Sequence, residues 1–297
     1  MQAVDSAFAN AGIKPPQRPI LLGRMFWEGL GWGGSIFPPK ELANQPGFTG
    51  DVLMAKAQRW YEEAYDERLH VDSSNGHAPV RLGNATWKAT ASRVYGQVRL
   101  FLDRNLQNKG IQVGTAQVEA SYNVLCAVDG LTQKLANRLS ELALVEYFDF
   151  YLRLHRVLQW RHELPNVKLF NIARADFEES TMAVMTHKYE QACWGAEQAI
   201  EKTLKGLLQL AGAEYPSGGS KAHNLLHLGG LLEIQNIVVS PDMLRRASYS
   251  AGVRYGKEEL SEDDALLANH AVLAVLDELR VSRRATELAA NAKQVNS

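Results

Sequence analysis

The sequence predicts a mainly α-helical protein that has a C-terminal helical bundle and an N-terminal helical region with a small antiparallel β meander. Three observations support this fold class. Apolar residues recur every three or four positions over residues 181–212, and helical periods return over residues 140–162 and 261–284. Strand-like alternation of apolar and polar residues is confined to residues 78–103.

The length of the chain and one short linker predict two domains. With 297 residues, 46% of them hydrophobic, the chain can bury a sizeable core. The motif ELPNVK, which contains Pro165, is the best candidate for a boundary. We therefore assign residues 1–165 to an N-terminal α+β region and residues 166–297 to the helical bundle, and we expect the two parts to pack together.

Composition limits the classes of partner and compartment. The 32 basic and 33 acidic residues nearly cancel, which argues against a general attraction to nucleic acid or membranes, although a local basic cluster can still bind phosphate. No signal peptide or stretch of roughly 20 apolar residues is visible, so we expect a cytoplasmic protein with no membrane contact. Cys126 and Cys193 lie in apolar patterns and are predicted to be buried, reduced thiols. No metal-binding spacing of histidines occurs, and we expect neither a metal nor a cofactor.

The first 50 residues are rich in proline and glycine, in the motifs KPPQRP, GWGG and FPPK, and cannot form one continuous helix. They also contain many large apolar residues, which a solvated linker would lack. We predict an irregular arm that packs along the body. The alternative is a partner-binding segment, because aromatic residues dominate binding hot spots. A helical pattern follows over residues 51–69.

A small sheet is predicted in the middle of the N-terminal region. Residues 78–82, 85–91 and 97–103 alternate apolar and polar side chains, and Gly83-Asn84 predicts a two-residue hairpin turn between the first two segments. We predict a three-stranded antiparallel meander that needs a helix against its apolar face. The helices predicted after the meander span residues 115–129, 131–139 and 140–162.

The longest helical pattern covers residues 181–212, and Gly212 stands where a C-terminal cap is expected. Its polar face carries Lys188, Glu190, Glu197, Gln198, Glu201, Lys202 and Lys205. Periodicity does not decide whether residues 173–211 form one helix or two helices that break near Ser180–Thr181. Later helices are predicted over residues 223–233, 241–248 and 261–284. The last of these opens with a variant capping box, Ser261-x-x-Asp264, and the final dozen residues are expected to fray.

Three motifs in the C-terminal half, taken in their order, resemble the HEPN family. They are AEQAIEKTLKGLLQLAG with Lys202 and Lys205, KAHNLLHLGGLL with His223 at a helix start, and SAGVRYG with Arg254-Tyr255 before the last long helix. The resemblance covers about residues 175–280. The stretch WYEEAYDERLHVD and the hairpin after it resemble the front half of larger HEPN-containing bacterial proteins.

The resemblance implies an up-and-down four- or five-helix bundle that usually dimerises through its helix faces. Many relatives are metal-independent RNases that use an Arg followed by a His after four to six residues, and this pair supplies a cation and a proton acceptor. Here Arg254 is followed by YGKEEL, and the next histidine is His270. The one literal match, Arg156 with His162, is the weak catalytic candidate. Its alternative is an ordinary polar helix surface.

The remaining candidate residues suggest a ligand site. Lys202 and Lys205 lie three positions apart and therefore share a helix face, where they could contact a phosphate. The candidate ligand-binding residues are Lys202, Lys205, His223, Arg254 and Tyr255. The competing interpretation makes the two lysines a solvated face paired with Glu197 and Glu201, and Tyr255 a packing residue.

We therefore predict a non-catalytic HEPN-like protein that binds a nucleotide or RNA, acts as a homodimer and serves in bacterial stress or defence, including toxin–antitoxin systems. A nucleotidyltransferase or defence protein is an expected partner. The alternatives are a metal-independent endoribonuclease that acts as a dimer, and a purely structural dimerisation protein.

Overall fold

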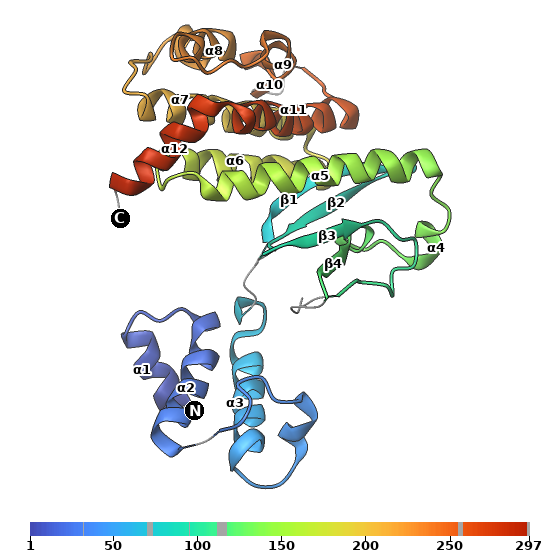
Figure 1. Ribbon diagram of the computed structural model, residues 1–297, viewed down its shortest axis with the longest axis vertical. Coiled ribbons are helices and arrows are strands. Elements are labelled where there is room, and N and C mark those ends of the chain that lie inside the picture. The colour runs from blue at the N-terminus through green and yellow to red at the C-terminus, as the bar shows by residue number, and fades with distance from the viewer. Residues whose placement is uncertain (32, 70–73, 95, 112–117, 255–257, 296–297) are drawn as a thin grey trace. The chain divides into compact units, whose positions relative to one another are not determined.

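The computed structural model describes residues 1–31, 33–69, 74–94, 96–111, 118–254 and 258–295 (Figure 1). Contacts between Cα atoms divide the chain into two compact units, Met1–Ser73 and Ser74–Ser297. The mainly helical fold class predicted from the sequence is confirmed. Among the described residues, no helix is both long enough and apolar enough to cross a bilayer.

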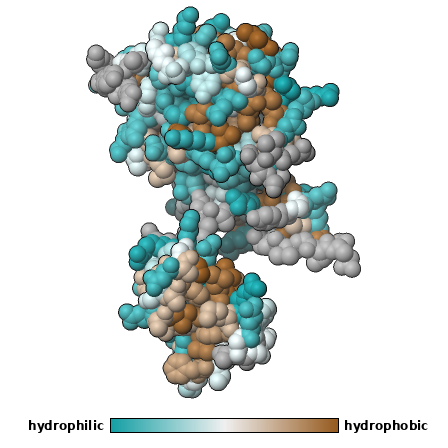
Figure 2. Space-filling model, turned by 90° about the vertical axis from the view of Figure 1, so that its left-hand side faces the viewer, coloured by the Kyte–Doolittle hydropathy of each residue, from teal (hydrophilic) through white to brown (hydrophobic). Residues whose placement is uncertain are grey.

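The N-terminal unit is a small helical assembly with a core of its own. Its helices are α1 (Gln2–Asn10), η1 (Pro15–Gln17), α2 (Arg18–Leu30), η2 (Lys40–Asn44), α3 (Gly50–Tyr65) and η3 (Asp66–Leu69). Phe8, Leu22, Ala57 and Tyr61 form the buried cluster. Other large apolar side chains, such as Phe37 and Phe48, are exposed, and Figure 2 shows apolar surface on this unit.

The prediction of an irregular arm over residues 1–50 is wrong. The prolines of KPPQRP lie at helix starts, where the missing N–H costs no hydrogen bond, so they allow η1 and α2 to begin. Gly31 ends α2 with a left-handed conformation. The helix predicted over residues 51–69 is confirmed as α3 followed by η3.

The predicted hairpin is confirmed, but the third strand pairs differently. β1 (Ser74–Leu82) and β2 (Ala85–Ser92) are antiparallel and turn at Gly83-Asn84. β3 (Val98–Phe101) pairs in parallel with β4 (Ala120–Asn123) and does not extend the hairpin, so the three-stranded meander is wrong.

The helix predicted over residues 115–129 is also wrong in its described part, which holds β4 and η4 (Val124–Ala127). Residues 118–124 alternate strictly between apolar and polar side chains, which is the period of a strand. Asn123 then stops the strand, because its side chain accepts a hydrogen bond from the Leu125 amide and starts η4. The helix expected over residues 131–139 is reduced to α4 (Gln133–Ala136).

The remaining helices build the body of the larger unit. They are α5 (Glu141–Glu163), α6 (Lys168–Met185), α7 (Tyr189–Leu210), η5 (Ser220–His223), α8 (Leu225–Ile234), α9 (Pro241–Arg246), α10 (Ala251–Arg254), α11 (Glu262–Val281) and α12 (Arg283–Val295). Residues 173–211 form two helices, but the break lies between Met185 and Tyr189 and not near Ser180–Thr181, and His187 in this break has a positive φ of 58°. The helix at 140–162 and the capping box at Ser261 and Asp264 are confirmed. The final residues, expected to fray, form α12 as far as Val295.

The larger unit is layered. The β1–β2 hairpin packs against α5 and α6, α7 and α11 lie on the other side of these helices, and α8 to α10 cover the far side of α7 and α11 (Figure 1). One buried cluster runs through all of these layers, from Ala78 to Ala289. Because this core is continuous, the boundary between the two compact units falls between Ser73 and Ser74. The domain boundary predicted from the sequence lies near Pro165. The assignment of residues 166–297 to a domain of their own stays a prediction.

Candidate functional site

The candidate site on α7 is built around one buried carboxylate. Oε1 of Glu201 accepts a hydrogen bond from the ammonium group of Lys205 at 2.7 Å. Oε2 of Glu201 lies 2.9 Å from Nδ1 of His223. Glu201 is only 3% exposed. Burial alone would raise the pKa of this carboxyl, but the hydrogen bonds from Lys205 and His223 outweigh burial and hold the pKa below its usual value. The charge of Lys205 is thus balanced inside the protein.

Lys202 is also in an ion pair, but its acidic partner lies on α6. Its Nζ lies 2.7 Å from Oδ2 of Asp176 on α6 and 2.8 Å from Oε1 of Gln198. Lys202 and Lys205 therefore share a helix face, as predicted, but each ammonium is in an internal ion pair. His223 is the most accessible member of the group, with 63% of its side chain exposed.

The polar face of α7 is buried where the sequence predicts a solvated surface. Glu197, Glu201 and Lys205 are each less than 9% exposed, because α8 and α10 pack against this face. The solvated-face interpretation is thus wrong for these three residues. The ion pair between Lys205 and Glu201 is confirmed, whereas Glu197 is not in an ion pair with either lysine among the described residues.

Among the described acidic residues of this region, Glu197 has the pKa that is shifted furthest from its ordinary value. Burial raises the pKa of Glu197 to about 7, although its carboxylate accepts the backbone N–H of Tyr249. Its Oε2 atom is buried and has no hydrogen-bond partner among the described residues. The Cys193 thiol, one turn earlier, is fully buried, and burial raises its pKa to about 11. Cys193 is therefore the buried thiol that was predicted, while Cys126 is half-buried.

The predicted Arg254 ends α10, which packs against α7, so its backbone belongs to the same region as Glu197. The Arg254 side chain and the whole of Tyr255 lie outside the described residues. The described part of the site thus consists of Lys202, Lys205 and His223 with their acidic partners.

The order of helices α6 to α11 and the motifs on them agree with one family model. The model of the HEPN domain matches residues 167–282. The C-terminal half of the chain carries a HEPN domain. The match begins next to α6 and ends next to α11, so the family resemblance expected for residues 175–280 is confirmed. No curated protein and no solved structure matches the chain significantly.

The weak catalytic pair lies just before the HEPN domain, on α5. Six residues along an α-helix correspond to a rotation of about 240°, so Arg156 and His162 leave the helix on different sides. Arg156 is exposed, whereas His162 is half-buried, with Nε2 3.0 Å from the carbonyl oxygen of Asn75. Within one chain, α5 does not bring the two side chains together.

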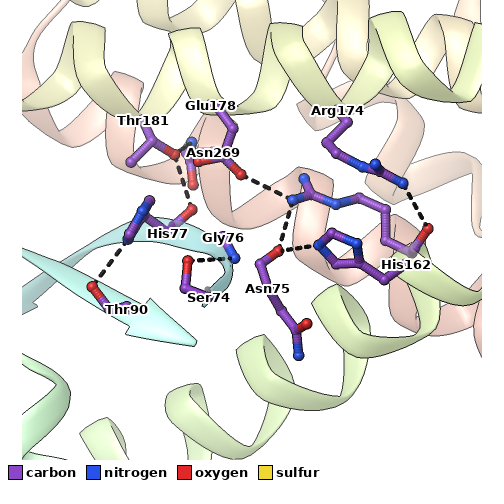
Figure 3. A network of polar contacts seen from close by, with 11 residues as sticks. Ser74, Asn75, Gly76, His77, Thr90, His162, Arg174, Glu178, Thr181 and Asn269 are labelled. Carbon is purple, nitrogen blue, oxygen red and sulfur yellow. Dashed lines mark hydrogen bonds and ion pairs between the residues drawn. The ribbon is translucent and has the colours of Figure 1, made fainter. Parts of the chain in front are cut away.

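A second polar cluster joins α5 and β1 to the HEPN domain (Figure 3). Arg161, next to His162, is 4% exposed. Its Nη2 donates to Oε1 of Glu178 at 2.9 Å and to the Asn75 carbonyl at 3.2 Å. Arg174 on α6 donates to the Arg161 carbonyl at 3.4 Å. Gly76 leaves room for this contact, since a Cβ there would overlap Oε1 of Glu178 and lie 2.7 Å from Nη2 of Arg161.

Sequence reasoning missed this cluster, although one signal was available. The buried stripe of α5 runs through Tyr147, Tyr151, Leu154 and Leu158, and the next position in that stripe is Arg161. An arginine at an apolar helical position indicates a buried charge that needs partners.

Proposed function

We propose that the protein is a non-catalytic HEPN-domain protein that binds a nucleotide or RNA. The observation that carries this proposal is the sequence after Arg254, in which no histidine occurs before His270. His270 lies on α11 with Nε2 2.8 Å from the Pro79 carbonyl and its ring 4.9 Å from Phe150. Burial lowers the pKa of His270, and the carbonyl requires a proton on Nε2, so this imidazole is a poor base for RNA cleavage.

The proposed ligand contacts are Lys202, Lys205, His223, Arg254 and Tyr255. A phosphate at this site would compete with Asp176 and Glu201 for the two ammonium groups. His223 supports the proposal because its side chain is largely exposed and is oriented from behind by Glu201. Binding is therefore expected to be weak, and to weaken further as salt screens the phosphate charge.

Catalysis is tested with total RNA and purified protein in the presence of EDTA. We expect the RNA to stay intact. Cleavage that persists in EDTA and disappears in His162→Ala would instead identify a metal-independent RNase.

Ligand binding is tested by fluorescence anisotropy with a labelled nucleotide and a labelled single-stranded RNA. We expect saturable binding that weakens about tenfold in Lys202→Gln and in His223→Ala, because each variant removes one contact to phosphate. Lys188→Gln is the matched control: Lys188 is exposed at the start of the same helix, about 20 Å from Lys202. If neither probe binds, or if all three variants bind equally, this site does not bind phosphate.

We also propose that the protein is a homodimer and that a nucleotidyltransferase or defence protein is its partner. HEPN domains often dimerise, which supports the first part. Light scattering coupled to size exclusion is expected to give twice the chain mass of 33.0 kDa. A monomer at micromolar concentration would contradict the homodimer.

A further inference from the structure

Positive charge exceeds negative charge in the polar cluster between the hairpin, α5 and α6. Among the residues that the structure describes, the cluster holds the guanidinium groups of Arg93, Arg161 and Arg174, the imidazole of His162 and one carboxylate, that of Glu178. With His162 neutral, these described groups carry three positive charges and one negative charge. Arg161 is buried and paired with Glu178, Arg174 is half-buried and Arg93 is exposed, so the positive charge that Glu178 does not balance lies toward solvent, where an anion can approach it.

Several of these donors are buried without a partner. Among the described residues, Nε and Nη1 of Arg161 and Nε of Arg174 have no hydrogen-bond acceptor. The cations also repel one another. Burial, reinforced by Arg174, lowers the pKa of both Arg161 and His162, although Glu178 partly offsets the effect at Arg161. Burial and Arg93 lower the pKa of Arg174, with Glu178 again opposing. An added anion would relieve this repulsion.

Asn75 arranges the cluster. Its carbonyl accepts from Arg161 and from His162 (Figure 3). Its side-chain oxygen accepts from Nε of Arg93 at 3.4 Å. Since the carbonyl can only accept, His162 carries its proton on Nε2. Asn75 is 4% exposed and Arg93 is exposed. The cluster is therefore fixed at the bottom and reaches solvent at Arg93.

On the side of Arg161 that faces Phe170, Phe177 and Val272, the protein has no space for a ligand. A cavity there is lined mainly by apolar residues, including Phe170, Phe177 and Val272, and its volume of about 10 Å³ suits one water molecule at most. An anion would therefore bind on the solvent side, against Arg174, Arg93 and His162, with Arg161 behind them.

We propose that Arg93, His162 and Arg174, backed by Arg161, bind the phosphate group of a small molecule. The planar guanidinium groups offer forked donors that match phosphate oxygens, and neutral His162 becomes a donor to phosphate when it is protonated. A small molecule fits better than an RNA backbone, because the deepest donors are buried and only one edge of the cluster is exposed. This site is separate from the proposed contacts on α7.

The test is calorimetric titration of the full-length protein with inorganic phosphate and with a nucleoside monophosphate, each against chloride at equal ionic strength. We expect saturable binding of at least one phosphate compound. Arg174→Gln and Arg93→Gln are each expected to weaken it about tenfold or more, because each removes a charged hydrogen bond. Arg93→Gln keeps the test valid if Arg174→Gln does not fold, since Arg93 is exposed. Arg153→Gln, at another exposed arginine on α5, is the control and should bind as the wild type does.

A second readout follows His162 by NMR. Bound phosphate adds negative charge beside the imidazole, so the pKa of His162 should rise on binding, and it should not rise in Arg174→Gln. The proposal is overturned if neither phosphate compound binds, or if both variants bind as tightly as Arg153→Gln.

Discussion

Glu197 is a carboxyl group whose ionisation opposes folding. Its side chain is buried and accepts the backbone N–H of Tyr249, and no cation among the described residues lies close enough to form an ion pair with it. The folded state therefore favours the protonated form. In the folded state its pKa is raised from the ordinary 4.5 to about 7, so the protein binds an extra proton between these two values.

This sets a direction for the pH dependence of stability. The contribution of Glu197 is most favourable at low pH and is lost as the pH rises from about 4.5 through 7, up to roughly 3 kcal/mol. Glu197→Gln resembles the protonated form, so it should match the wild type near pH 5 and exceed its free energy of unfolding at pH 8. Urea denaturation at both pH values measures this, with Glu233→Gln at an exposed position of α8 as the control. Equal stability of wild type and Glu197→Gln at pH 8 would contradict it.

At the scale of elements, α6 and α7 pack against each other more extensively than any other two described helices of the larger unit. Gly206 on α7 makes this approach possible, because a Cβ at that position would overlap the ring of Phe170 on α6. The same pair carries the ion pair between Lys202 and Asp176. The spacing between these helices therefore controls both the core and the candidate site.

Gly206→Ala should lower the free energy of unfolding by about 1–3 kcal/mol, because the added methyl group forces the two helices apart. Alanine normally favours a helix over glycine, so the sign of the effect separates overpacking from helix propensity. Gly230→Ala in α8 is the matched control. No atom lies within 4 Å of its added Cβ, and this variant should be neutral or slightly stabilised. Thermal and urea unfolding of both variants would measure the difference.

Most of the helices could be predicted from the sequence, and the errors have identifiable physical causes. Proline disfavours a helix interior but is tolerated at a helix start, so the prolines of KPPQRP suggest an irregular arm although they lie at the starts of η1 and α2. Residues 118–124 have the period of a strand, but they lie within a longer apolar stretch, residues 115–129, over which a helix is predicted from the sequence, and the parallel partner β3 holds them as β4. The polar face of α7 looked solvated because helix periodicity does not reveal which later segments cover a face.

The candidate site was predictable only in part. Lys202 and Lys205 were placed correctly on one face, but their partners Asp176 and Glu201 depend on helix packing. The cluster at Arg161 depends on Asn75, which lies 86 residues away in the sequence. Such pairing of distant residues leaves only one local signal, an arginine in an apolar stripe.

At the scale of the whole molecule, the hairpin, α5 and the HEPN domain share one core. Val80 of β1, Leu158 of α5 and Phe177 of α6 belong to the same buried cluster, while the N-terminal unit has a separate one. The sequence boundary near Pro165 therefore passes through a continuous apolar interior.

Two fragments would test this shared core. A fragment of residues 74–297 should keep its helical circular dichroism and unfold cooperatively, since its core is complete. A fragment of residues 166–297 loses β1 and α5 and exposes the faces of α6 and α11 that pack on them. It should unfold at a lower urea concentration or aggregate. If both fragments are equally stable, the HEPN domain folds without α5 and the division near Pro165 describes the folding units correctly.

Arg161 and Glu178 lie so close to Gly76 that the residues at these three positions should change together in evolution. Its φ of 129° and the nearby Arg161 and Glu178 leave no room for a side chain at position 76. A lineage that replaces this glycine must also replace the arginine or the glutamate with a smaller group, and a lineage that keeps the ion pair must keep the glycine. Aligned homologous sequences should therefore show positions 76, 161 and 178 changing together, although 85 residues separate the first from the second.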